Sequence, residues 1–380
     1  MTITWSSIIF LVVACFGTYF VIFNFSKSRV GIRLAIPAMV LEIALGYGLG
    51  KFNTGATITH GPTYVIGEVG VVAIIASGAL HIVTTAERKI LRHGALIAVL
   101  GVTFSIVLIG GATLGAGRNS ITAFVIGLAL APTSAGVASR VLVLAGKNKS
   151  YVGQTFFVTA IIDDAIGLLG LALLELLATH KGSNALTGII IEVGAGIAAG
   201  ALFHVTRRLP SGYLKSRLLG LTLWSAIAIF TVLATMLGSS PIVVAFLLVA
   251  GLSPILSNSK KASDIVEKSG ILLVPLFFVS LGAIAASLTF PGTSAVLLSI
   301  LLSILAVGAK VFAARLGYGS TGFVSLGAML VPRAEITFVI ALLGRSLGLL
   351  TDSDFFIVAL CAVTLSVAGS LVLPRLVAKV

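Results

Sequence analysis

The sequence predicts an all-α polytopic membrane protein with thirteen transmembrane helices. The first observation is composition. The 380 residues are 58% hydrophobic and only 10% charged, whereas soluble domains carry about 25% charged residues. The second is that the apolar runs are long and continuous, which favours helices over the alternating strands of a barrel. The third is the uneven distribution of Lys and Arg between successive loops.

Thirteen runs approach the length of about 20 residues that a spanning helix requires. Their connections are short, and we expect no appended soluble domain. The N-terminus lacks the basic region of a signal peptide, so we expect the first run to be retained. In chain order, the runs cover residues 4–25, 31–50, 64–84, 94–115, 119–145, 151–179, 185–206, 217–237, 240–258, 269–289, 294–314, 319–347 and 354–374.

The cations predict the orientation of the chain in the membrane. Nineteen of the 25 Lys and Arg residues lie in one set of alternating loops or in the tail, and four lie in the other set. Because cytoplasmic loops carry the excess of cations, we expect a plasma-membrane protein whose N-terminus lies outside and whose C-terminus is cytoplasmic. This distribution also accounts for the net charge of +13 without nucleic-acid binding.

Two of the runs, 119–145 and 319–347, are interrupted by a proline in a polar patch. Pro132 and Pro332 are 200 residues apart and hold matching places in the two halves of the chain. Proline removes a backbone hydrogen bond and kinks or breaks a helix. Paired broken helices in corresponding positions are typical of transporters built from inverted repeats. We therefore expect two discontinuous helices related by such a repeat.

The polar residues beside the prolines are candidate site residues. Thr133 and Ser134 follow the first proline, and their hydroxyls could replace part of the water shell of a hard cation. The alternative is that they bond only to the local backbone. Arg333 and Glu335 follow the second proline. They could neutralise each other, cap the half-helix ends or take part directly in transport.

Asp163 and Asp164 are the strongest functional signal in the chain. They lie side by side in the apolar run 151–179, where each carboxylate costs about 2.5–3.5 kcal/mol on insertion scales. Consecutive helical positions diverge by about 100°, so we expect one carboxylate to face the ion path and the other a neighbour. A structural ion-pair cluster is the alternative. The pair predicts a cation and proton site.

Lys310 is the natural partner of these acids. It lies in the run 294–314, where an unpaired ammonium is as costly as a carboxylate. Pairing with the aspartates would make its state depend on what they bind. The alternative is that Lys310 extends to the cytoplasmic interface.

Together these residues resemble a known family, the NapA-type branch of the monovalent cation–proton antiporters, which is related to NhaA. The motifs that carry the resemblance are APTSAGVASRVL (131–142), IIDDAIGL (161–168), VPLFFVSLGA (274–283), GAKVFAARLG (308–317) and VPRAEITFVIALLG (331–344). The resemblance implies that Asp164 carries the ion, that Asp163 pairs with Lys310, and that Thr133 lies where the broken helices cross. One departure is the proline directly before Thr133.

The resemblance also implies a homodimer with an NhaA-like inverted repeat. Dimerisation or scaffold helices would cover 1–91, the first half of the core transport domain 92–179, linker and dimerisation helices 180–290, and the second half of the core 291–380. The membrane lipid would surround both parts.

The implied function is electrogenic exchange of Na⁺ or Li⁺ for H⁺ by alternating access, with Na⁺ bound at Asp163 and Asp164. The chain would be a transporter and not an enzyme, and no nucleotide or metal cofactor is implied. A potassium–proton antiporter of the same fold is the alternative. A channel and an intramembrane aspartyl protease are more distant ones, and the protease would need its two acids on facing helices.

Overall fold

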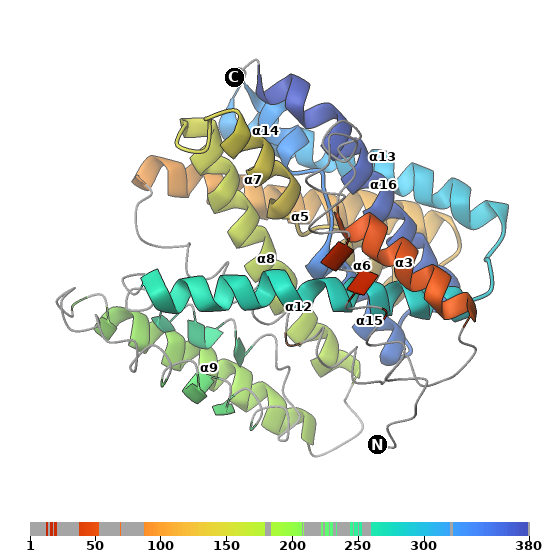
Figure 1. Ribbon diagram of the computed structural model, residues 1–380, viewed down its shortest axis with the longest axis horizontal. Helices are drawn as coiled ribbons and strands as arrows, with labels where there is room; N and C mark the ends of the chain where they lie inside the picture. Colours follow the sequence, from red (N-terminus) through yellow and green to blue (C-terminus); the bar gives the residue numbers. More distant parts are fainter. Residues whose placement is uncertain are drawn as a thin grey trace. The chain divides into compact units, whose positions relative to one another are not determined.

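A computed structural model describes residues 38–52, 87–178, 184–206, 260–319 and 322–378, together with scattered residues elsewhere. All regular elements within these residues are α-helices (Figure 1). In chain order they are α3 (Ala38–Phe52), α5 (Arg88–Gly115), α6 (Ser120–Ala129), α7 (Ala135–Leu144), α8 (Tyr151–Ala178), α9 (Asn184–Thr206), α12 (Lys260–Ser287), α13 (Thr293–Tyr318), α14 (Phe323–Met329), α15 (Glu335–Ser346) and α16 (Asp352–Val377).

Several helices are longer than their apolar runs. α5 begins at Arg88 and α12 at Lys260, six and nine residues before the predicted starts, and α13 continues to Tyr318. The added turns are rich in Lys and Arg. Such residues fall outside a run defined by hydropathy, but a helix accommodates them outside the hydrocarbon layer. Four predicted runs fall mostly outside the described residues, namely 4–25, 64–84, 217–237 and 240–258.

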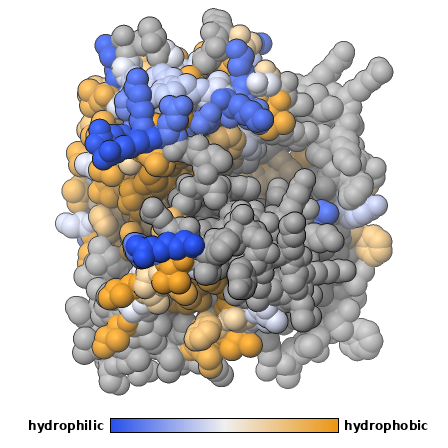
Figure 2. All heavy atoms as spheres, turned by 90° about the vertical axis from the view of Figure 1, so that its left-hand side faces the viewer, coloured by the Kyte–Doolittle hydropathy of each residue, from blue (hydrophilic) through white to orange (hydrophobic). Residues whose placement is uncertain are grey.

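Four helices are long and apolar enough to cross a membrane. They are α5, the Tyr151–Gly170 part of α8, α13 and α16. Their outward faces are apolar, as shown by Val107, which is 61% exposed, and Ile304, which is 64% exposed. Figure 2 shows a broad hydrophobic surface next to a band of hydrophilic side chains. Such a surface suits contact with lipid. The chain is therefore a multi-pass membrane protein.

The chain divides into two compact units. Unit 1 comprises Met1–Thr18, Leu45–Thr85 and Leu171–Ile284, and unit 2 comprises Tyr19–Ala44, Ala86–Gly170 and Ala285–Val380. Within unit 1, Leu45 and Leu49 pack against a small cluster on α12 formed by Leu276, Val279 and Ala283. The predicted site residues all lie in unit 2, which the following paragraphs describe.

Both proline-containing segments of unit 2 are broken helices. The first consists of α6 and α7, which are separated by residues 130–134, and the second consists of α14 and α15, which are separated by residues 330–334. The breaks touch each other, because the Ser134 amide donates a hydrogen bond to the Pro332 carbonyl over 2.8 Å. The prediction of two interrupted helices is confirmed.

Glycines let each broken helix approach a long helix closely. A Cβ atom on Gly127 of α6 would lie 2.9 Å from Ile106 Cα of α5, and one on Gly327 of α14 would lie 2.7 Å from Val311 Cα of α13. Both distances are shorter than van der Waals contact, so only glycine fits at this spacing. The two glycines precede Pro132 and Pro332 by the same five residues.

Each break also rests on the long helix that follows it. A Cβ atom on Gly167 of α8 would lie 2.6 Å from Pro132 Cγ, and one on Gly369 of α16 would lie 2.7 Å from Pro332 Cγ. The proline rings therefore occupy the space that a side chain at these glycines would need. These contacts fix the breaks at the middle of the unit.

The two ends of unit 2 differ in charge. At one end, the Tyr151 hydroxyl lies 3.0 Å from His93 Nδ1 and the Tyr151 ring contacts Tyr318, which brings together the starts of α5 and α8 and the end of α13. The exposed cations at this end are Arg88, Lys89, Arg92, Lys149 and Arg315. At the other end, Arg118 and Arg345 are both paired with aspartates, at 2.9 Å to Asp354 and 2.6 Å to Asp352.

The close contact at Gly127 gives a stability prediction. We expect Gly127→Leu to lower the free energy of unfolding by about 1–3 kcal/mol, because the added atoms must displace the α5 backbone. Gly111→Leu is the matched control, since a Cβ atom there meets no other atom within 4 Å. Thermal unfolding of the purified proteins in detergent measures the difference. Equal stability of the two variants would contradict the packing described.

Candidate functional site

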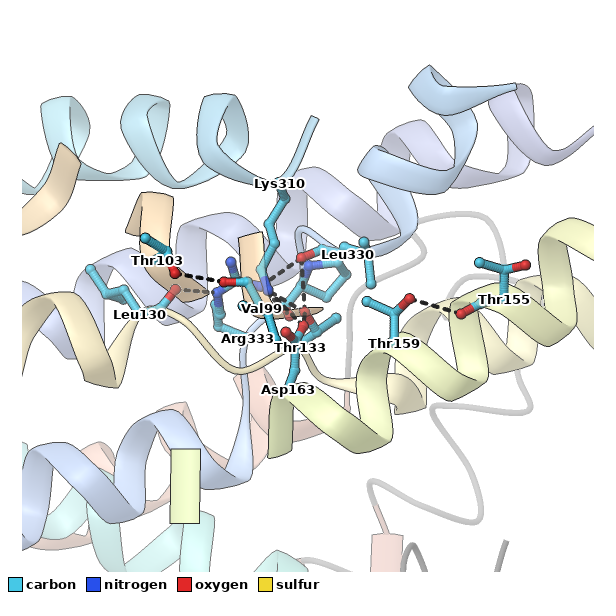
Figure 3. Close-up of polar contacts among 11 residues, drawn as sticks. Val99, Thr103, Leu130, Thr133, Thr155, Thr159, Asp163, Lys310, Leu330 and Arg333 are labelled. Atoms are coloured by element: carbon cyan, nitrogen blue, oxygen red, sulfur yellow. Dashed lines mark hydrogen bonds and ion pairs between the residues drawn. The ribbon is translucent and has the colours of Figure 1, made fainter. Parts of the chain in front are cut away.

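Lys310 and Asp163 form a buried ion pair at the centre of unit 2. Figure 3 shows the Lys310 side chain extending from α13 toward the carboxylate on α8. The Nζ–Oδ2 distance is 2.6 Å, and both side chains are 0% exposed. Lys310 therefore does not extend to the interface in this state. Each partner depends on the other, because removing either would leave an uncompensated buried charge.

Thr133 joins this pair to the helix breaks. Its hydroxyl lies 2.8 Å from Asp163 Oδ2 and 3.2 Å from the Leu330 carbonyl oxygen. The hydroxyl has a single hydrogen, so it can donate to only one of these acceptors at a time. Thr133 can therefore change its hydrogen bond when the state of Asp163 changes.

Arg333 caps the ends of the broken helices. Its Nε donates to the Leu130 carbonyl over 2.8 Å, and one terminal nitrogen donates to the Leu330 carbonyl over 2.6 Å. These carbonyls follow directly after α6 and α14, where helical acceptors lack intrahelical partners and carry partial negative charge. The Arg333 side chain is fully buried, and no Arg333–Glu335 ion pair occurs within the described residues. These bonds are those of the capping role predicted for Arg333, and a direct role in transport stays a prediction.

The bonds between the breaks are reciprocal. Thr133 and Arg333 hold matching positions, 200 residues apart, as do Leu130 and Leu330. The Thr133 hydroxyl lies 3.2 Å from the Leu330 carbonyl oxygen, while Arg333 Nε donates to the Leu130 carbonyl. Each break thus places a polar side chain next to a carbonyl of the other.

Asp164 has different surroundings from Asp163. It is partly exposed, whereas Asp163 is completely buried. Asp164 interacts electrostatically with Asp163 and Glu335, which repel it, and with Lys310, which attracts it. The Glu335 side chain in turn interacts with Ser134 at the first break. The divergence of the two aspartates agrees with their consecutive positions on a helix.

Several oxygen atoms near the pair are free to accept a cation. Among the described residues, Asp163 Oδ1 has no hydrogen-bond partner although it is buried. The Asp164 carboxylate and the Thr133 hydroxyl add oxygen ligands of the kind that hard cations prefer. A cation bound to Asp163 would compete with the Lys310 ammonium, since both are attracted to the same carboxylate. The described residues contain no group of three or more His, Cys, Asp or Glu that could hold a resident metal ion.

The structure adds residues that the sequence did not single out. Ser366 of α16 donates to the Arg333 carbonyl and accepts from the Arg333 amide, which fixes the second break. Glu42, an acid in the run 31–50, is 3% exposed and interacts electrostatically with Glu335. A serine in an apolar helix carries little signal by itself, whereas an acid in an apolar run, such as Glu42, is conspicuous in the sequence.

The ion pair gives a prediction on stability. We expect Asp163→Asn and Lys310→Met each to lower the free energy of unfolding by about 3–5 kcal/mol, because each leaves one buried charge unpaired. The double variant removes both charges, and we expect it to recover most of the loss. Thermal unfolding of the four proteins in detergent forms a double-mutant cycle. Additive losses in the double variant would contradict a direct pair.

Comparisons with known proteins agree with this architecture. The sequence profile described as "Sodium/hydrogen exchanger, transmembrane" matches residues 11–379. The chain is 29% identical to the high-affinity Na(+)/H(+) antiporter NhaS3 of Synechocystis, over 80% of this chain and 69% of that protein. It is 28% identical to the ammonium/H(+) antiporter subunit AmhT of Alkalihalophilus pseudofirmus, over 88% of this chain and 87% of that protein.

A solved structure shares the fold. The sodium proton antiporter MjNhaP1 from Methanocaldococcus jannaschii superposes with a TM-score of 0.69 at 14% sequence identity, over 98% of this chain and 97% of that one. At this identity the likeness establishes the architecture alone. The family profile covers nearly every residue, and the protein is a member of the sodium/hydrogen exchanger family of transmembrane proteins.

Proposed function

We propose that this protein exchanges Na⁺ or Li⁺ for H⁺ across the plasma membrane by alternating access. The observation that carries the proposal is the buried Lys310–Asp163 pair, which lies between two broken helices and next to a second aspartate. An intramembrane ion pair with an unsatisfied carboxylate oxygen is typical of an ion pathway. Membership of the exchanger family supports the same conclusion.

Asp164 is the proposed carrier of the ion. Its partial exposure and lack of an ion pair among the described residues suit a group that exchanges its ligand. Asp163 acts as its partner and holds Lys310 when no cation is bound. Na⁺ favours the charged carboxylates and a proton removes that charge, so the two ions exclude each other. Thr133 and Ser134 supply further oxygen atoms at the first break.

The release of Lys310 provides the coupling. When Na⁺ neutralises the two aspartates, the attraction between Asp163 and the ammonium weakens and the lysine can leave. The return of Lys310 then displaces the cation. The proton that leaves Asp164 balances the charge of one Na⁺. The electrogenic exchange that the family resemblance implies requires a second proton to leave in the same cycle. Arg333 and Glu335 support the site, the arginine through the helix caps and the glutamate through Ser134.

The same proposal covers the wider architecture. Thirteen spans, an inverted repeat and a homodimer are its elements, with the core transport domain at 92–179 and 291–380. The reciprocal bonds between the breaks and the matching glycines support the repeat, and the compactness of unit 2 supports the core. The end of unit 2 that carries the exposed Lys and Arg side chains is the proposed cytoplasmic side, with the C-terminus there and the N-terminus outside.

Transport by Asp164 is directly testable. In proteoliposomes that contain a pH-sensitive dye, we expect an imposed Na⁺ gradient to drive proton flux, and Asp164→Asn to abolish it because the carrier can no longer ionise. Asp352→Asn is a matched control, since this acid is 57% exposed and lies at the far end of the unit. Flux at the wild-type level in Asp164→Asn would rule out the proposed carrier. Parallel gradients of Li⁺, K⁺ and NH₄⁺ define the cation preference.

Competition between the ions predicts a pH dependence. As pH falls, protons occupy the carboxylates, so the apparent KM for Na⁺ should rise by up to about tenfold per pH unit while the maximal rate changes less. Initial rates measured at several Na⁺ concentrations over about two pH units test this. A constant KM with a falling maximal rate would mean that proton and cation bind at separate sites.

A further inference from the structure

Ser105 of α5 is an unusual buried hydroxyl. Two threonines on the same helix donate to the carbonyl one turn earlier, Thr103 to Val99 over 2.8 Å and Thr113 to Ile109 over 2.7 Å. Ser105 is 0% exposed, yet its Oγ has no hydrogen-bond partner among the described residues. An unsatisfied buried hydroxyl is destabilising, so its presence here calls for a partner in another state.

The segment of α5 just before Ser105 touches the lysine of the site. A Cβ atom on Gly101 would lie 3.0 Å from Lys310 Nζ and 3.1 Å from its Cδ. The absence of a side chain at Gly101 therefore leaves room for the lysine on its way to Asp163.

Gly101 and Ser105 lie on the same face of α5. They are four residues apart, and side chains with this spacing have Cβ atoms about 5–6 Å apart. Both belong to the buried stripe of the helix, which also contains Ile97, Val102 and Ile109. The lysine side chain has a flexible stem of four carbons, so its ammonium can move over such a distance without movement of the backbone. Ser105 is therefore within reach of Lys310 when the lysine leaves Asp163.

We propose that the Ser105 hydroxyl is a second docking position for the Lys310 ammonium, occupied when a cation holds Asp163 and Asp164. This proposal rests on the proposed function and adds the destination of the released lysine. The ammonium donates to Ser105 Oγ, and the hydroxyl hydrogen can turn to the Gly101 carbonyl, which is the usual acceptor for a helical serine. Without this position the freed ammonium would be buried with no acceptor, and the cation-bound state would be disfavoured.

Na⁺ binding to purified variants tests this role. The readout is the Na⁺ concentration at half of the maximal thermal stabilisation, which also serves variants that do not transport. We expect Ser105→Ala to raise this concentration about tenfold, the effect of losing one hydrogen bond to a charged group. Ser105→Thr keeps the hydroxyl and should stay near the wild type. Thr113→Val is the matched control, because it removes a buried hydroxyl that already has a partner on the same helix.

Repeating the measurement in a Lys310 variant shows whether Ser105 acts through the lysine or only through packing. In Lys310→Met no ammonium needs a docking position, so Ser105→Ala should not change Na⁺ binding further. The proposal would be overturned if Ser105→Ala weakened Na⁺ binding equally with and without Lys310. It would also be overturned if Ser105→Ala did not weaken Na⁺ binding in the protein that retains Lys310. Ser105→Cys, of similar size but with a weak acceptor, replaces Ser105→Ala if that variant does not fold. Failure of the wild type to bind or exchange Na⁺ would instead contradict the proposed function.

Discussion

The burial of one ion pair determines much of this structure. Lys310 and Asp163 lie 2.6 Å apart with no exposure to solvent, inside helices whose outer faces are apolar. Charges in such a place are stable only while they compensate each other, so their attraction constrains where α8 and α13 can lie. The same dependence makes the pair responsive, because a bound cation or proton on the aspartate changes what the lysine requires. Stability and the proposed exchange thus involve the same two side chains.

The helix breaks solve a related problem for the backbone. An interrupted helix exposes carbonyls that the membrane interior cannot hydrogen-bond, and here side chains from the opposite break supply the donors. Arg333 bonds to Leu130 and Leu330, and Thr133 reaches both Leu330 and Asp163. The carbonyl network and the ion pair therefore share Thr133. A change at the aspartate reaches the breaks through a single hydroxyl.

The features that could be predicted from the sequence are those that are energetically unfavourable in an apolar helix and therefore rare there. Asp163, Asp164 and Lys310 stand out because charges are rare in apolar runs, and Pro132 and Pro332 because proline interrupts a helix. The acceptors of Arg333 were not predictable, since backbone carbonyls look alike in every sequence. Ser105 and Thr103 could not be distinguished either, because only the folded helix shows which hydroxyl bonds to its own backbone. Helix ends were misjudged where cationic turns extend beyond the apolar run.

The seating of each proline ring on a glycine has a mechanical meaning. Because the Pro132 ring packs directly against Gly167 of α8, the first break is held against the helix that carries Asp163 and Asp164. Pro332 packs against Gly369 of α16 in the same way. In the proposed exchange, a displacement of α8 would therefore move the break with it and preserve the distance between Thr133 and the aspartates. The proposed ligands of the ion would thus move as one rigid body. Their arrangement around the ion would be the same on both sides of the membrane.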